Sequence, residues 1–68
     1  MNAEEIRALS VDEIKERLED AREELMKLRF QMATGELSDT NRLPITRKLI
    51  ARLMTVLQEK ERHLEGEA

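Results

Sequence analysis

Apolar residues recur at helical spacing along most of this chain. Between residues 11 and 32 they are separated alternately by three and four residues, which places them on one stripe of an α-helix. These positions are Val11, Ile14, Leu18, Ala21, Leu25, Leu28 and Met32. An unbroken alternation of this length is typical of a helix that packs lengthwise against another helix. We therefore predict a first long helix over residues 10–34.

Residues that favour helix ends flank this first stripe. Ser10 is a preferred N-cap residue, and Glu13 completes a capping box three residues later. Leu9 and Ile14 occupy the two positions of a hydrophobic staple. Gly35 is placed to adopt the left-handed conformation that ends a helix.

A second apolar stripe follows in the C-terminal half. Its positions, again three and four residues apart, are Leu43, Thr46, Ile50, Leu53, Leu57, Lys60 and Leu64. Leu49 and Val56 widen this stripe, whereas Lys60 is expected to weaken its far end. Pro44 is tolerated only in the first turn of a helix, so we predict a second helix that begins at or near Asn41 and spans residues 41–64.

The remaining segments complete an all-α fold. Residues 1–9 predict a short helical turn, with Asn2 as its cap. Residues 35–40 form a connection short enough to make the two long helices antiparallel neighbours, and residues 65–68 are expected to form a frayed tail. The prediction is a single domain over residues 1–68, a coiled-coil-like antiparallel two-helix hairpin.

Composition narrows the classes of function. The 68 residues are 40% hydrophobic and 40% charged, with one His and no Cys, so we expect neither a metal site nor another cofactor. No apolar run approaches the roughly 18 residues of a membrane helix, and a signal-peptide core is missing. We therefore expect a cytoplasmic protein without a membrane partner. A two-helix rod also lacks a pocket for a small-molecule substrate, and we predict no enzymatic activity.

Charge is distributed unevenly. The net charge is −3, yet residues 40–56 contain four basic residues and no acid. With two more from the end of the first helix, the basic cluster near the connection comprises Lys27, Arg29, Arg42, Arg47, Lys48 and Arg52. Because salt limits electrostatic reach to about 8–10 Å, such a local cluster matters more for phosphate binding than the net charge.

The second helix places several of these cations on the face opposite its apolar stripe. Lys48, Arg52 and Thr55 share that face, and Arg47 flanks it. An ordinary solvated surface remains one interpretation. Together with Phe30 and Gln31 at the end of the first helix, a surface that follows RNA phosphates is the favoured one.

Phe30, the single aromatic residue, lies off the first apolar stripe. It falls about 160° from the stripe's centre, and Met26 lies one turn before it on the same side. Either the N-terminal turn covers both residues, or they form an exposed anchor for a larger partner, which we favour. The acidic residues opposite the first stripe argue against RNA binding along that face.

The order of the residues between positions 28 and 57 resembles that of the family of protein twenty-nine of the bacterial large ribosomal subunit. The similarity covers about residues 10–62. The matching positions are Leu28, Arg29, Phe30, Gln31, Ala33, Gly35, Leu37, Arg47, Ile50, Ala51, Arg52, Thr55, Val56 and Leu57. The acidic net charge and Pro44 depart from the family pattern.

The resemblance implies a helical hairpin that binds large-subunit ribosomal RNA near the polypeptide exit tunnel. It also implies a neighbour, large-subunit ribosomal protein twenty-three, and contact with targeting or chaperone factors at the exit site. It would place Arg29, Phe30 and Gln31 at the RNA-proximal end of the first helix, and Arg47, Arg52 and Thr55 along the second.

Our interpretation is a structural, RNA-binding constituent of the large ribosomal subunit. A coiled-coil adaptor that binds other proteins through its apolar stripe is the alternative, since the stripe alone supports it equally well. A helical enzyme built by dimerisation is the least favoured class, because it would need buried Arg and Glu pairs along a stripe that is almost wholly apolar.

Overall fold

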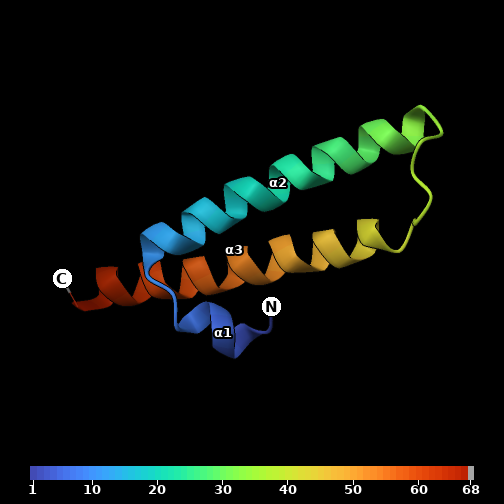
Figure 1. Cartoon of the computed structure of the whole chain (residues 1–68). Helices are drawn as coiled ribbons and strands as arrows, with labels where there is room; N and C mark the ends of the chain where they lie inside the picture. The colour runs from blue at the N-terminus through green and yellow to red at the C-terminus, as the bar shows by residue number, and fades with distance from the viewer. Residues whose placement is uncertain (68) are drawn as a thin grey trace.

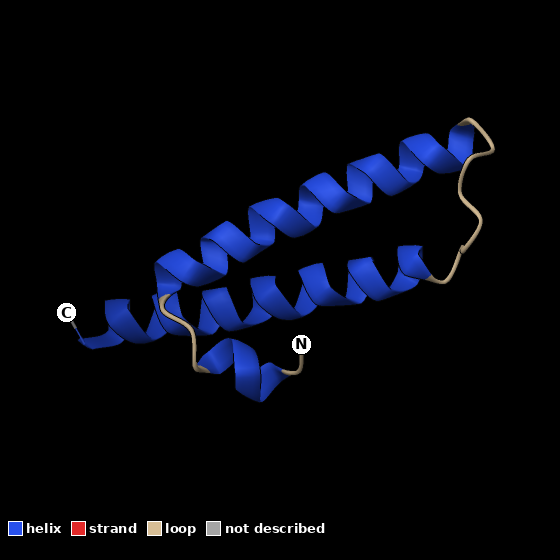
Figure 2. Ribbon diagram, in the orientation of Figure 1, coloured by secondary structure: helices blue, strands red, loops and turns tan. Residues whose placement is uncertain are grey.

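Two long antiparallel helices and one short helix make up the chain. The computed structural model describes residues 1–67, with α1 at Ala3–Arg7, α2 at Val11–Ala33 and α3 at Arg42–Glu67. The described residues contain no strand (Figure 2). The molecule is a rod of 50 × 17 × 14 Å, in which α2 and α3 pack along each other and α1 lies against α3 (Figure 1). The predicted all-α hairpin is thus confirmed.

The ends of α2 follow from local sequence. Ser10 and Glu13 form a reciprocal capping box, in which each side chain accepts a hydrogen bond from the other residue's backbone N–H at 3.2 Å. At the other end Gly35 has φ +78°. The N–H groups of Gly35 and Glu36 donate to the carbonyl oxygens of Met32 and Gln31, the pair of bonds that defines a Schellman motif.

The second long helix begins at Arg42, which puts Pro44 in its first turn, where the missing N–H costs nothing. The Asp39 carboxylate accepts a hydrogen bond from the Asn41 N–H at 3.0 Å just before the helix starts. The expected tail was wrong for residues 65–67, because α3 continues to Glu67. Gly66 lies in this last turn, where a glycine weakens a helix without necessarily ending it. Residue 68 lies outside the described residues.

The core lies at the end of the hairpin that carries α1. Its main cluster combines Ile6 of α1 with Ile14, Leu18 and Ala21 of α2 and with Leu53 and Val56 of α3. Near the connection, Leu28 and Leu43 are also buried, but outside that cluster. Packing of the amphipathic faces, rather than intrinsic helix propensity, therefore stabilises helices of this length.

The two predicted stripes are buried over less than their full length. Met32 is 54% exposed and Leu64 is 57% exposed, although both positions continue the apolar spacing. Lys15 of α2 forms an ion pair with Glu61 of α3 at 3.8 Å. Leu64 lies one turn beyond Glu61, so it is beside the first turn of α2, and α2 does not extend further to cover it. Met32 occupies the last turn of α2, and in Figure 1 the two ribbons diverge toward the connection.

Lys60 interrupts the second stripe without leaving a buried charge. Its side chain is half-buried, and its Nζ donates a hydrogen bond to the Leu9 carbonyl oxygen at 2.5 Å. The aliphatic stem thereby stays against apolar neighbours while the ammonium reaches a polar partner. Within the described residues, no helix has the length and apolar run that a membrane crossing would need.

Candidate nucleic-acid interface

The basic part of α3 is a continuous segment without acidic residues. Four cations lie between residues 42 and 58, and Glu59 is the first acid of the helix. All four are exposed: Arg42, Arg47, Lys48 and Arg52. A segment of this kind attracts polyanions because no carboxylate within the segment offsets its charge.

Arg42 is the one cation of this segment that is paired with an acid. Its Nη2 lies 2.5 Å from Oε1 of Glu24 on α2, and both side chains remain partly exposed. The pair joins the two long helices close to the connection. Arg42 therefore has a carboxylate partner that would have to be exchanged before it could bind a phosphate.

Arg52 and Thr55 lie beside α1. Nη1 of Arg52 donates to the carbonyl oxygen of Met1 at 3.2 Å, and both residues border a shallow groove between α1 and α3. The Thr55 hydroxyl donates to the carbonyl oxygen of Ala51 at 2.8 Å, so its hydrogen is used within the helix. The Met1 carbonyl oxygen carries no net charge, so this contact does not neutralise the charge of Arg52.

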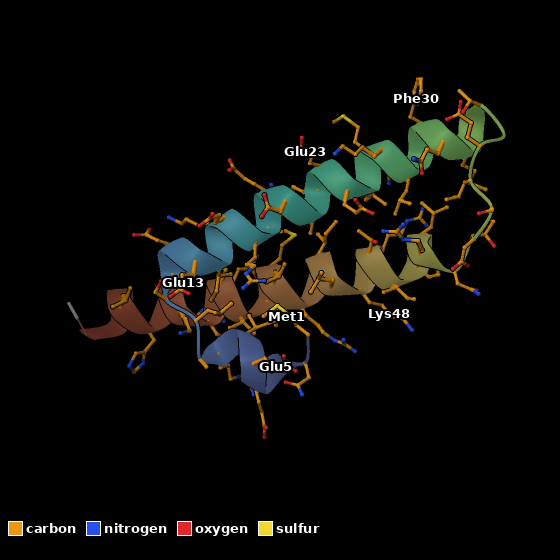
Figure 3. All side chains as sticks on the ribbon, viewed as in Figure 1. Met1, Glu5, Glu13, Glu23, Phe30 and Lys48 are labelled. Atoms are coloured by element: carbon orange, nitrogen blue, oxygen red, sulfur yellow. The ribbon has the colours of Figure 1, made fainter. Side chains whose placement is uncertain are left out.

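Arg47 and Lys48 are the two cations of the acid-free segment that have no partner among the described residues. Neither makes a side-chain hydrogen bond or an ion pair with another described residue. Figure 3 shows Lys48 on the side of α3 that faces away from α2. Arg47 and Arg52 are separated by about 140° around the helix. The cations of α3 therefore wrap around its outer surface instead of forming one flat patch.

The end of α2 presents its candidates in a different direction. Phe30 is 67% exposed and points away from α3 (Figure 3). The prediction of an exposed aromatic is confirmed, because α1 packs against α3 and does not cover it. Lys27 and Arg29 are exposed on either side, whereas Gln31 is half-buried. The backbone carbonyl of Gln31 accepts hydrogen bonds from the helix-ending turn.

The nine candidates therefore fall into two groups. One group lies at the end of α2 and comprises Lys27, Arg29, Phe30 and Gln31, whereas the other lies along α3 and comprises Arg42, Arg47, Lys48, Arg52 and Thr55. The sequence did not indicate that Met1 borders the second group. Only the packing of α1 brings that carbonyl to Arg52, and no sequence signal fixed the side of α3 to which α1 binds.

The comparisons with known proteins agree on one family. The family model described as "Ribosomal L29 protein" matches residues 4–60. The chain belongs to the ribosomal L29 protein family. That match includes every candidate residue on α2 and α3.

Individual relatives are closely similar. The "Large ribosomal subunit protein uL29" of Mycobacterium sp. (strain KMS) is 58% identical over 57 residues, which cover 84% of this chain and 74% of that protein. The protein of the same name from Staphylococcus aureus (strain JH9) is 52% identical over 61 residues, covering 90% and 88% respectively. The Staphylococcus carnosus (strain TM300) protein gives the same values.

Proposed function

We propose that this member of a ribosomal protein family is a structural constituent of the large ribosomal subunit that binds large-subunit ribosomal RNA. Family membership supports the ribosomal role, and the similar proteins are named as large-subunit proteins. The role is structural rather than enzymatic, and its setting is the cytoplasmic ribosome. Proximity to the polypeptide exit tunnel, to protein twenty-three and to targeting or chaperone factors belongs to the proposal and rests on the family resemblance.

The observation that carries RNA binding is the acid-free segment of α3. Arg47, Lys48 and Arg52 provide three exposed cations over two turns, none of them paired with a carboxylate. Arginine binds phosphate oxygens in a bidentate manner, and lysine acts as a point charge. Each phosphate that is neutralised releases counterions, which is the main source of affinity for RNA.

The remaining candidates extend this surface toward the connection. Lys27 and Arg29 add charge at the end of α2, and the Gln31 amide is a neutral hydrogen-bonding group beside them. Thr55 continues the outer face of α3 with a small side chain, which permits close approach of a sugar–phosphate chain. Arg42 contributes only where RNA competes with Glu24 for its guanidinium.

A charge reversal tests the proposal. Arg47→Glu with Arg52→Glu should abolish binding of the chain to large-subunit ribosomal RNA in a filter-binding assay, while circular dichroism shows unchanged helicity. The matched control is Arg17→Glu with Arg22→Glu, which changes the net charge equally on α2. Binding by the first variant at the wild-type level would refute the α3 surface.

Ionic strength separates this function from a protein adaptor. Phosphate binding weakens steeply with salt, whereas an apolar helix interface does not. Ile14, Leu18 and Leu53 are already buried within the hairpin, so an adaptor that uses the stripe would have to open the chain first. This burial favours the RNA-binding proposal over the adaptor.

A further inference from the structure

An apolar pair is exposed on the face of α2 that points away from α3. Met26 is 72% exposed and Phe30 is 67% exposed. Residues four apart on a helix contact each other, so the two side chains form one continuous patch. A large exposed aromatic beside a flexible methionine is the kind of surface that anchors a protein partner. The described part of the chain offers nothing to cover it, because α1 packs on α3.

Three acids continue the same line toward the start of α2. Together with the apolar pair they form what we call the outer stripe, which comprises Glu16, Glu19, Glu23, Met26 and Phe30. The three glutamates are exposed, and the ion pairs of the described residues involve other carboxylates. The outer stripe is therefore divided along its length into an acidic half and an apolar half.

We propose that the outer stripe binds an amphipathic helix of another protein, one that carries Lys or Arg along one half of its contact line and Leu or Met along the other. The spacing of three and four residues gives a straight line of about 21 Å, which a helix of about 14 residues would match. Helix-against-helix docking uses apolar anchors at this spacing, and charge complementarity fixes its direction.

The three glutamates of the outer stripe argue against a polyanion as its occupant. Glu23 lies only one turn from Met26 on α2, well within the screening length of about 8–10 Å, so an RNA strand over Phe30 would meet carboxylates. Four of the cations proposed for RNA lie on α3, and the other two, Lys27 and Arg29, lie on either side of Phe30 but outside the outer stripe. The inference goes beyond the proposed function, since it adds a second binding surface and assigns Phe30 to a protein partner instead of RNA.

The test is a titration of the isotope-labelled full-length chain with designed helical peptides, followed by amide chemical shifts. The matched peptide carries three lysines followed by two leucines along its contact line. The control peptide has the same composition, with lysine and leucine alternating along that line. The matched peptide should shift amides between residues 16 and 30 and bind at least tenfold more tightly than the control. Equal binding of the two peptides, or shifts confined to α3, would overturn the proposal.

Variants separate this surface from the RNA-binding surface. Glu23→Ser with Met26→Ser, which leaves every candidate RNA-binding residue in place, should weaken the matched peptide at least tenfold and change RNA affinity less than twofold. Ile45→Ser removes an equally exposed apolar residue, 63% exposed on α3, and should leave peptide affinity unchanged. If the double variant instead loses RNA and keeps the peptide, the outer stripe is an RNA contact and the inference is wrong.

Two further results have distinct meanings. A fall in diffusion rate with protein concentration in the absence of peptide, abolished by the double serine variant, would make a second copy of this chain the occupant and overturn the inference. Retention of RNA by Arg47→Glu with Arg52→Glu would refute the proposed function alone, since the peptide titration does not involve those residues.

Discussion

Lys60 and Leu9 join the C-terminal half of α3 to the segment between α1 and α2. The Nζ of Lys60 lies 2.5 Å from the Leu9 carbonyl oxygen, and the interaction is partly shielded from solvent. The Lys60 side chain thus binds the backbone of the segment that connects α1 to α2. A charge-assisted hydrogen bond at such a site contributes more than a bond between neutral groups.

Replacement of Lys60 by Met should destabilise the protein. Met retains an apolar stem but leaves the Leu9 carbonyl without its donor, at an expected cost of roughly 1 kcal/mol, reduced by partial exposure. Urea unfolding followed by circular dichroism measures the change. Lys15→Met is the control, because its ion pair with Glu61 is exposed and long at 3.8 Å. Equal losses in the two variants would show that the Leu9 contact has no special role.

The cap of α2 should respond to acid. Hydrogen bonds from the Ser10 backbone and side chain, with smaller contributions from Arg17 and Lys60, hold the pKa of Glu13 below its ordinary value. Because a lowered pKa stabilises the folded state only while the group is ionised, this contribution is present above the ordinary glutamate pKa and is lost as the pH falls through the lowered value.

Ser10→Ala tests this linkage directly. Removal of the hydroxyl should raise the pKa of Glu13 toward its ordinary value and destabilise α2 by about 1 kcal/mol. A titration of the Glu13 carboxyl carbon by nuclear magnetic resonance measures the pKa. Glu16, one turn further along α2, serves as the internal reference. An unchanged Glu13 titration in the variant would contradict the capping explanation.

Gly35→Ala should destabilise the hairpin through its backbone. A Cβ at this position would meet no atom within 4 Å, so steric crowding contributes nothing. The cost comes from φ +78°, which an L-residue adopts with a penalty of about 1 kcal/mol. Thermal unfolding should show a smaller loss for Gly35→Asn, because Asn tolerates the left-handed region better. A larger loss of thermal stability for Gly35→Asn than for Gly35→Ala would refute this explanation.

Neutralising Glu24 should strengthen RNA binding. Glu24→Gln removes the carboxylate that pairs with Arg42 and makes that guanidinium available for phosphate. An exposed pair of this kind contributes less than about 1 kcal/mol to folding, so stability should change little. RNA affinity at fixed salt should rise roughly twofold to fivefold. Glu23→Gln is the charge-matched control, and an equal gain there would assign the effect to net charge.

Local signals were sufficient to predict the long helices and the exposure of Phe30. Ser10 with Glu13 fixes the start of α2, and Gly35 fixes its end, because caps depend on neighbours in sequence. Phe30 is exposed because the helical period alone turns it away from the stripe that contains Leu28.

Contacts between distant segments were beyond sequence reasoning. Neither the Glu24–Arg42 pair nor the Arg52–Met1 contact follows from spacing, since each depends on how one helix is rotated against another. Periodicity likewise predicted burial of Met32, which is exposed because α3 does not extend far enough beside it to cover it.

The lengthwise position of the core has a mechanical consequence. Apolar side chains from three helices meet at the α1 end, whereas Leu28 and Leu43 are the buried apolar residues nearest the connection. Amide protons at the α1 end should therefore exchange with solvent more slowly than those beside the connection. We therefore expect the α1 end to hold the separation of α2 and α3 more firmly than the tip, where fewer apolar side chains join the two helices.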